Sequence, residues 1–284
     1  MRSAQKSYPD TAVKPRAISY IQGLFAHAQH LHVNGNLADA MAAYNTILKK
    51  RRNHFGSQHM LGLCNYQRGN YEMAARHLKK AALLDPQSAV VQSDLGIALK
   101  ALQLRDEAMV CFDRAIALRP DFANAYYNRA NLLNDHDSFA EAIRGFDQAI
   151  AIKPNHMHAW KNRGNALCAL GRFSDALASY DQAIAIDPGD AVSWANRAEA
   201  LRILLRIQDA VLSCDKDLAI DSNLAIAWLI RANIMTDAGE DAEAMASCQR
   251  ALVIDPKFPS ALTKLSKLMA QRPDVKTSDS SRAP

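Results

Sequence analysis

The sequence predicts an all-α protein: an α-solenoid of about seven 34-residue helix-turn-helix repeats, followed by a C-terminal capping helix. Three observations support this prediction. Proline recurs every 34 residues, small residues recur at two fixed places in each interval, and apolar residues follow a helical spacing. The recurring residues are Pro86, Pro120, Pro154, Pro188 and Pro256, with Ser222 at the remaining place. A strict period of this length is typical of stacked units that contact only their neighbours.

Placing the recurring proline at position 32 defines the repeats. They are 21–54, 55–88, 89–122, 123–156, 157–190, 191–224 and 225–258, and the cap is 259–272. We expect residues 18–272 to form one array without an internal domain border. The first 17 residues and residues 273–284 are polar and short of apolar anchors. We therefore expect 1–17 to be a flexible N-terminal segment and 273–284 to be a disordered tail.

Each repeat contains two amphipathic helices. Apolar residues at positions 4, 8 and 11 form a stripe on the first helix, and those at 20, 24, 27 and 28 form a stripe on the second. Position 8 is Gly or Ala and position 20 is always Ala, so the two helices are expected to pack closely. Gly at position 15 of four repeats can supply the turn between them. The proline at position 32 ends the second helix.

The pattern is similar to that of a known family. It matches W-x2-L-G-x2-Y…A-x3-F…P over residues 21–258, and all three tryptophans occupy position 4. Residues 159–188 (AWKNRGNALCALGRFSDALASYDQAIAIDP) fit it closely. The chain thus resembles the tetratricopeptide repeat (TPR) family. The resemblance implies a right-handed superhelix whose concave inner face is lined by the first helix of each repeat.

Composition restricts the cellular context. No apolar run approaches the roughly 20 residues that a membrane span needs, and the N-terminus lacks the apolar core of a secretory signal. The five cysteines are scattered without a CxxC pair, which favours a reducing, cytoplasmic location and argues against disulfides and zinc. The net charge of +5 is uneven, because residues 1–88 hold 12 Lys/Arg against 4 Asp/Glu. An acidic partner near that end is therefore plausible.

Motifs for catalysis and cofactors are missing. The sequence has no GxxxxGK[ST], GxGxxG, GxSxG or HExxH. His27 and His30 share a helical face, but no further ligand spacing completes a metal site. The basic run 49–52 is interpreted as cations at the end of a helix. We therefore predict no catalytic residue, no cofactor and no metal, and a chain that is not an enzyme.

An arginine–aspartate register joins consecutive repeats. Wherever position 25 is Asp, position 7 of the next repeat is Arg. The pairs are Asp113/Arg129, Asp147/Arg163, Asp181/Arg197 and Asp215/Arg231. We expect partly buried bridges, with removal of one partner costing about 3 kcal/mol. The alternative is that recent duplication copied both residues together.

Asparagine recurs on the face that the family uses for binding, formed by positions 2, 5, 6, 9 and 12 of each first helix. A carboxamide offers a donor and an acceptor, and can therefore hold the backbone of an extended peptide. Such a ladder resembles the one in the superhelix of O-linked N-acetylglucosamine transferase. Lys161 would favour an acidic side chain or a terminal carboxylate, while Ile226 and Ile230 make the C-terminal end apolar and disfavour chaperone-tail recognition. The predicted partner-binding residues are Asn124, Tyr127, Asn128, Asn131, His158, Lys161, Asn162, Asn165, Asn196 and Glu199. The alternative is that these are solvated residues inherited by duplication.

The repeat 191–224 departs from its neighbours. It carries Leu205 for Gly, Cys214 for an aromatic residue, Asp217 for Ala and Ser222 for Pro. We expect Asp217, in a usually apolar slot, to be either paired or exposed.

We therefore predict a protein–protein interaction scaffold that binds an extended polypeptide along the concave groove. The alternative is a substrate-recruiting arm, or stand-alone relative, of a protein O-glycosyltransferase that lacks the catalytic domain, since nothing after residue 272 could hold one. RNA binding is a third and weaker interpretation. The expected partner is a protein or peptide, with no membrane involved and nucleic acid disfavoured.

Overall fold

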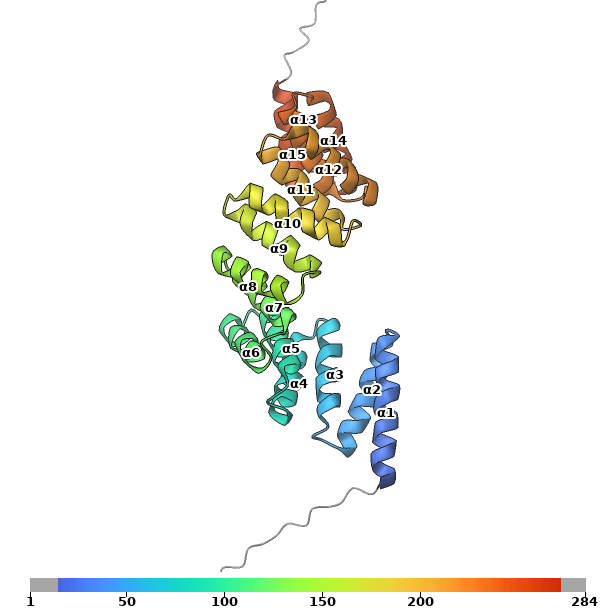
Figure 1. Cartoon of the computed structure of the whole chain (residues 1–284). Helices are drawn as coiled ribbons and strands as arrows, with labels where there is room; N and C mark the ends of the chain where they lie inside the picture. Colours follow the sequence, from blue (N-terminus) through green and yellow to red (C-terminus); the bar gives the residue numbers. More distant parts are fainter. Residues whose placement is uncertain (1–14, 272–284) are drawn as a thin grey trace, which may run out of the picture. The chain divides into compact units, whose positions relative to one another are not determined.

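The computed structural model describes residues 15–271, and these form fifteen α-helices and no strand (Figure 1). The chain divides into two compact units, unit 1 (residues 1–132) and unit 2 (residues 133–284), with the boundary inside α7 (Ala123–Asn134). The all-α helical-repeat solenoid is confirmed. That residues 18–272 form one array without an internal domain border stays a prediction. Repeats contact only their neighbours, so an array can divide at a single junction.

Unit 1 contains three complete helix pairs and most of α7. Each pair packs against the next, because every second helix also contacts the first helix that follows it in α1–α5. The remaining bounds are α1 Pro15–Val33, α2 Leu37–Lys50, α3 Phe55–Gln67, α4 Tyr71–Leu84, α5 Ala89–Ala101 and α6 Arg105–Leu118. The core lies between the paired helices, where Tyr44, Leu78 and Phe112 are fully buried.

Unit 2 begins with a second helix and ends with the predicted cap. Its bounds are α8 Phe139–Ile152, α9 Met157–Ala169, α10 Phe173–Ile186, α11 Ala191–Ile203, α12 Ile207–Ile220, α13 Ala225–Asp237, α14 Asp241–Ile254 and α15 Pro259–Gln271. The capping helix α15 packs on α14. None of the helices described, in either unit, is long and apolar enough to cross a membrane.

The N-terminal segment departs from its prediction at its end. Helix α1 starts at Pro15, inside the 1–17 segment for which we expected flexibility. Proline suits the first turn of a helix because its missing N–H would have no partner there in any case. The rest of that segment and the tail 273–284 lie outside the described residues.

Glycine at position 8 allows the close approach of paired helices. A Cβ on Gly164 would lie 2.5 Å from Tyr180 Cε1, and one on Gly62 would lie 2.5 Å from Leu78 Cγ. Both distances are below ordinary van der Waals contact. The residue at position 24 therefore packs directly on the backbone at position 8, as the repeat pattern predicts.

The turn at position 15 has a left-handed backbone in every repeat. The glycines there have φ between 71° and 81°, as at Gly171 and Gly239. The non-glycine residues Gln103, Asp137 and Leu205 adopt φ values of 61°, 59° and 58°. Position 15 of the repeat therefore has a left-handed backbone conformation whatever its residue, and a residue with a Cβ is sterically strained there.

The arginine–aspartate register forms ion pairs. Arg163 Nε lies 2.7 Å from Asp147 Oδ1 and Arg197 Nε lies 2.7 Å from Asp181 Oδ1. The equivalent distances are 2.7 Å for Arg129–Asp113 in unit 1 and 3.9 Å for Arg231–Asp215 in unit 2. The four aspartates are 47–56% exposed, however. The arginines are 22–36% exposed, so the bridges are partly buried on one side only. Each pair is therefore worth about 1 kcal/mol rather than 3.

Each arginine of unit 2 that lies in this register also contacts its own repeat. Arg163 Nη1 donates to Ser179 Oγ at 2.7 Å and Arg197 Nη1 donates to Ser213 Oγ at 2.6 Å. The same guanidinium groups lie 5.9 Å from the ring centres of Trp160 and Trp194. A single arginine thus joins the second helix of one repeat to both helices of the next.

The tryptophans at position 4 are held by the preceding turn. Trp160 Nε1 donates to the Pro154 carbonyl at 2.9 Å, and Trp194 Nε1 donates to the Pro188 carbonyl at 3.0 Å. Trp228 bonds the Ser222 carbonyl in the same way at 2.9 Å. The bond uses a backbone oxygen, and so it survives the replacement of proline by Ser222.

Asp217 contradicts the expectation that it would be paired or exposed. Its side chain is 0% exposed, and neither carboxylate oxygen has a hydrogen-bond partner among the described residues. Burial, with a further contribution from Asp221, raises the pKa of Asp217 from 3.8 to about 6. A charged carboxylate at neutral pH is therefore held in a slot that other repeats fill with alanine.

Candidate interaction surface

The predicted binding residues share one face of the first helices, at positions 2, 5, 6, 9 and 12, which we call the first-helix face. Those at positions 124, 127, 128 and 131 lie on α7 and belong to unit 1. Those at positions 158, 161, 162 and 165 lie on α9, and those at 196 and 199 lie on α11, all in unit 2. The surface of each unit is described separately.

In unit 1 the first-helix face contains a hollow. It has a volume of about 320 Å³ and is lined by side chains of α3, α5, α6 and α7, together with Gln103 of a turn. Asn128 lies at its edge and donates from Nδ2 to Ser93 Oγ at 3.3 Å. Tyr66 and Ile97 contribute apolar surface. The predicted asparagine therefore does reach a cavity, but its amide also joins α7 to α5.

In unit 2 two of the predicted asparagines bond to each other. Asn196 Nδ2 donates to Asn165 Oδ1 at 2.9 Å, and the Tyr180 hydroxyl donates to the same oxygen at 2.8 Å. Asn165 is exposed and Asn196 is half-buried. A carboxamide has two N–H donors and two acceptor lone pairs, so these bonds leave hydrogen-bonding capacity on both side chains. The asparagines connect α9 to α11 and still present polar atoms outward.

Lys161 is already neutralised within the chain. Its Nζ lies 3.1 Å from both carboxylate oxygens of Asp190, and the two side chains are only 14% and 15% exposed. Asp190 also accepts from the Ser193 backbone N–H, which caps α11. Burial alone would raise the pKa of Asp190, but hydrogen bonds from Ser193 and Lys161 outweigh burial and lower it. Lys161 is thus a poor candidate for holding an acidic group of a partner.

Glu199 is engaged in a three-residue network. Arg202 contacts Glu199 at 2.7 Å on the same helix and Asp237 of α13 at 2.6 Å. The side-chain hydrogen bonds that Arg202 donates to Glu199 are the main reason that the pKa of Arg202 is raised. This network ties α11 to α13 across the first-helix face, and it accounts for the position of Glu199 without a partner.

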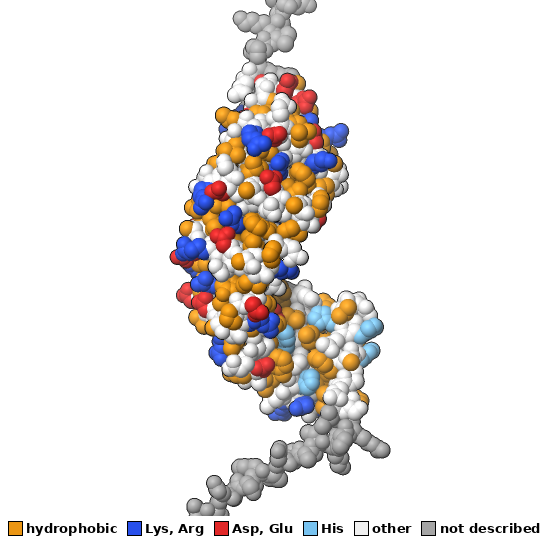
Figure 2. Space-filling model, viewed as in Figure 1, with side chains coloured by type: hydrophobic (Ala, Val, Ile, Leu, Met, Phe, Trp, Pro, Cys, Tyr) orange, Lys and Arg blue, Asp and Glu red, His pale blue; other side chains and the backbone are white. Residues whose placement is uncertain are grey.

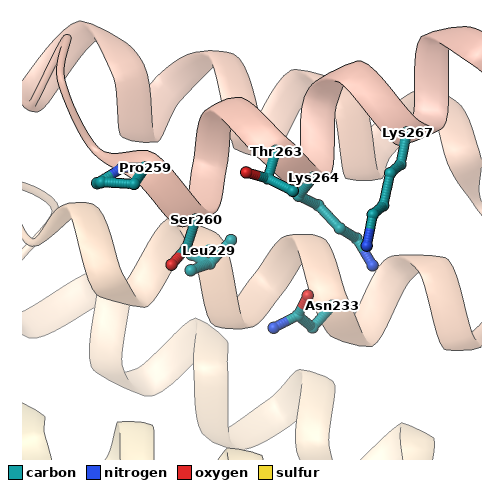
Figure 3. Close-up of a pocket in the computed structure, with 7 residues that line it drawn as sticks. All are labelled: Leu229, Asn233, Pro259, Ser260, Thr263, Lys264 and Lys267. Atoms are coloured by element: carbon teal, nitrogen blue, oxygen red, sulfur yellow. The ribbon is translucent and has the colours of Figure 1, made fainter.

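A second hollow lies between α13 and α15, outside the predicted set of residues. Its volume is about 470 Å³. Figure 3 shows Lys264 and Lys267 reaching from α15 toward α13, where Leu229 and Asn233 lie. Neither lysine has an Asp or Glu within ion-pair distance in the part of the chain that the structure describes. The sequence gave no sign of this hollow.

Histidines gather in unit 1 without forming a metal centre. Figure 2 shows several of them on the N-terminal part of the chain. His59 Nε2 lies 2.6 Å from Asp94 Oδ2, and His77 Nδ1 lies 2.8 Å from Gln58 Oε1. Within residues 15–271, no group of three or more His, Cys, Asp or Glu side chains is placed to hold a metal ion. These histidines connect neighbouring helices.

Profiles of one repeat family match three parts of the chain. The profile described as "Tetratricopeptide repeat" matches residues 56–88 and 158–190, and that described as "TPR repeat" matches residues 106–137. The first two matches coincide with the repeats defined by the proline spacing.

Two curated proteins resemble short stretches of the chain. Transcription factor tau subunit sfc4 of Schizosaccharomyces pombe is 27% identical over 140 residues, which is 44% of this chain. Cell division cycle protein 27 homolog B of Arabidopsis thaliana is 30% identical over 80 residues, which is 28% of this chain. The matched stretches span only 13% and 11% of those two proteins.

Solved structures share the fold. A MamA structure is 27% identical with a TM-score of 0.53, covering 58% of this chain and 96% of MamA. PilF of Pseudomonas aeruginosa is 18% identical with a TM-score of 0.67, covering 77% and 97% of the two chains. YrrB, described as a TPR protein with an unusual peptide-binding site, is 19% identical with a TM-score of 0.57, covering 67% and 98%.

Proposed function

Because the chain is a tetratricopeptide repeat protein, we propose that it is a non-catalytic scaffold that binds an extended segment of a partner protein along its first-helix face. The observation that carries the proposal is the paired carboxamide of Asn165 and Asn196. Their remaining donors and acceptors match those of a peptide backbone, which presents an N–H and a C=O at every residue.

Apolar side chains on the same face support a peptide partner. Val192 and Ile226 are 46% and 49% exposed, and both occupy position 2, on the contacting helices α11 and α13. An exposed apolar pair beside amide groups suits a polypeptide, which offers apolar side chains and backbone polar groups together. Since all five cysteines are unpaired, we place the scaffold in a reducing, cytoplasmic environment.

The test is site-specific photo-crosslinking in the cells that make the protein. A benzoylphenylalanine is placed at position 165 or 226 of the first-helix face, and in control variants at position 212 or 253. Leu212 and Val253 are 65% and 75% exposed on the second helices α12 and α14. We expect protein adducts from the first-helix face alone. Equal adducts from the second helices, or none from either, would exclude this surface as the binding site.

The glycosyltransferase alternative uses the same surface and stays a prediction. The two functions differ in what should co-purify with the chain. A recruiting arm should co-purify with a catalytic chain, whereas a stand-alone scaffold should yield only its partner in the crosslinked fraction.

A further inference from the structure

The cations on the first-helix face of unit 2 fall into two groups. Lys161 is paired with Asp190 at 3.1 Å, and Arg202 is paired with Glu199 and Asp237 at 2.7 and 2.6 Å. Lys264 and Lys267 differ, because no carboxylate of residues 15–271 lies within ion-pair distance of either. Positive charge that is available to a ligand is thus concentrated at α15.

These two lysines border a hollow rather than an open surface. The hollow of about 470 Å³ lies between α13 and α15, and Lys264 and Lys267 reach over it toward Asn233 (Figure 3). Lys264 is half-buried and Lys267 is exposed. Ser260 and Thr263 add hydroxyl groups to the wall. Ammonium, carboxamide and hydroxyl donors therefore line one hollow, and this set of donors suits a carboxylate.

One side of the hollow is apolar. Leu229 forms part of its lining and is 9% exposed. One helical turn earlier on α13 lies Ile226, which is 49% exposed, and Val192 occupies the same position on the contacting helix α11. A ligand that fits both parts carries a negative group close to an apolar group. An acidic polypeptide segment with a nearby apolar side chain has this combination.

The surrounding charges disfavour a polyanion. Glu199 and Asp237 lie on the neighbouring helices of the same face, and their carboxylates are 35% and 34% exposed. A nucleic acid backbone would bring phosphates toward these groups and would find only two unpaired lysines in the hollow. A single carboxylate side chain brings one negative charge to the two lysines, whereas a nucleic acid brings several.

We propose that the hollow formed by Leu229, Asn233, Lys264 and Lys267 binds an Asp or Glu side chain of an acidic peptide segment, with the apolar neighbour of that residue packed on Ile226 and Val192. The inference rests on the proposed function, since it names the class of peptide that the same face selects.

The test is a selection of random decapeptides displayed between two linkers, so that no free carboxy terminus is presented. The full chain is compared with a Lys264→Gln/Lys267→Gln variant and with a Lys216→Gln/Lys257→Gln control. Lys216 and Lys257 are exposed elsewhere on unit 2, so the control loses the same charge. Circular dichroism checks that all three proteins are folded.

We expect Asp and Glu to be enriched on the wild type and the control but not on the Lys264→Gln/Lys267→Gln variant. A selected peptide, measured by fluorescence anisotropy, should bind that variant about tenfold more weakly, as expected for losing a charge-assisted hydrogen bond. Replacing its Asp and Glu by Asn and Gln should have a similar effect on wild-type binding.

The other outcomes overturn the inference in distinguishable ways. Peptides selected without acidic enrichment, or enriched equally on the Lys264→Gln/Lys267→Gln variant, leave the proposed function standing and remove the acidic site. Displacement of the peptide by inorganic phosphate or a uridine oligonucleotide at matched ionic strength assigns the hollow to another anion. If no peptide is selected on any of the three proteins, the proposed function fails as well.

Discussion

Replacing Asp217 by alanine should stabilise unit 2 at neutral pH. Asp217 on α12 is 0% exposed, and its carboxylate oxygens have no hydrogen-bond partner among residues 15–271. The same position is a fully buried alanine in five of the six other repeats, at Ala81, Ala115, Ala149, Ala183 and Ala251, and Ile47 in the first. Since alanine is the common residue of this slot, the substitution removes a buried charge from a site that packs well without it.

The size of this stabilisation follows from the pKa of Asp217. Burial raises the pKa of Asp217 from 3.8 to about 6. One pKa unit corresponds to about 1.4 kcal/mol, so the carboxylate costs unit 2 about 3 kcal/mol when it is ionised. The folded state binds the proton more tightly than the unfolded state. The cost is therefore absent below pH 3.8, grows up to about pH 6, and is complete above it.

The assay is urea unfolding followed by tryptophan fluorescence between pH 4.5 and pH 8. All three tryptophans, at positions 160, 194 and 228, lie in unit 2 and report on it alone. Asp217→Ala should raise the free energy of unfolding by about 3 kcal/mol at pH 8 and by clearly less at pH 4.5. The better helix propensity of alanine, at most about 0.7 kcal/mol, does not depend on pH and can be subtracted.

A matched control places the same charge one repeat earlier. Ala183→Asp should destabilise unit 2 at pH 8 and lose much of that effect at pH 4.5, because Ala183 fills the equivalent buried slot. A gain from Asp217→Ala that is the same at both pH values would show that the carboxylate is not a buried charge. No gain at pH 8 would refute the reasoning outright.

Three further experiments test the packing. A double-mutant cycle on Arg163 and Asp147, measured by urea unfolding, should give a coupling of about 1 kcal/mol because Asp147 is 48% exposed; a value near zero would contradict the bridge. Gly164→Ala should destabilise unit 2 by about 1–3 kcal/mol, since its Cβ would lie 2.5 Å from Tyr180 Cε1, and an unchanged melting temperature would contradict this packing. Leu205→Gly should stabilise unit 2 by about 1 kcal/mol because φ is 58°; a lower melting temperature would show that the exposed leucine makes an unrecognised contact.

The repeat pattern predicted most of the helix pairing. Three features each impose a steric or hydrogen-bonding requirement within one repeat length of sequence: position 8 opposite position 24, glycine at the turn, and tryptophan at position 4. Each requirement recurs in several repeats, and so one sequence displays it more than once. The left-handed turn at Gln103 and Leu205 shows that the neighbouring helices impose the slot even where its usual residue is lost.

The contacts of the surface residues were less predictable. The sequence located the binding residues on the first helices, but it did not reveal that Lys161 is paired with Asp190, 29 positions later. Such a pair depends on the side-chain conformers of two helices and on the cap that fixes Asp190. The hollow beside Lys264 was missed for a similar reason, since it depends on how α15 packs relative to α13. The sequence showed that Asp217 is unusual at its position in the repeat. It did not predict that the carboxylate would be buried without a hydrogen-bond partner among the described residues.

Along the first-helix face of unit 2, some cations are paired with carboxylates of the same chain and others are not. Lys161 and Arg202 form ion pairs with carboxylates of the same chain. The electrostatic fields of these charges therefore largely cancel when no ligand is bound. In the proposed function, a partner there hydrogen-bonds through its peptide backbone to the carboxamides of Asn165 and Asn196, whatever its side chains are. At α15 the lysines are uncompensated, and a partner's own charge decides the energy. The two proposals therefore assign affinity for extended peptides in general and selection for acidic ones to different helices of one unit, so each can be tested without the other.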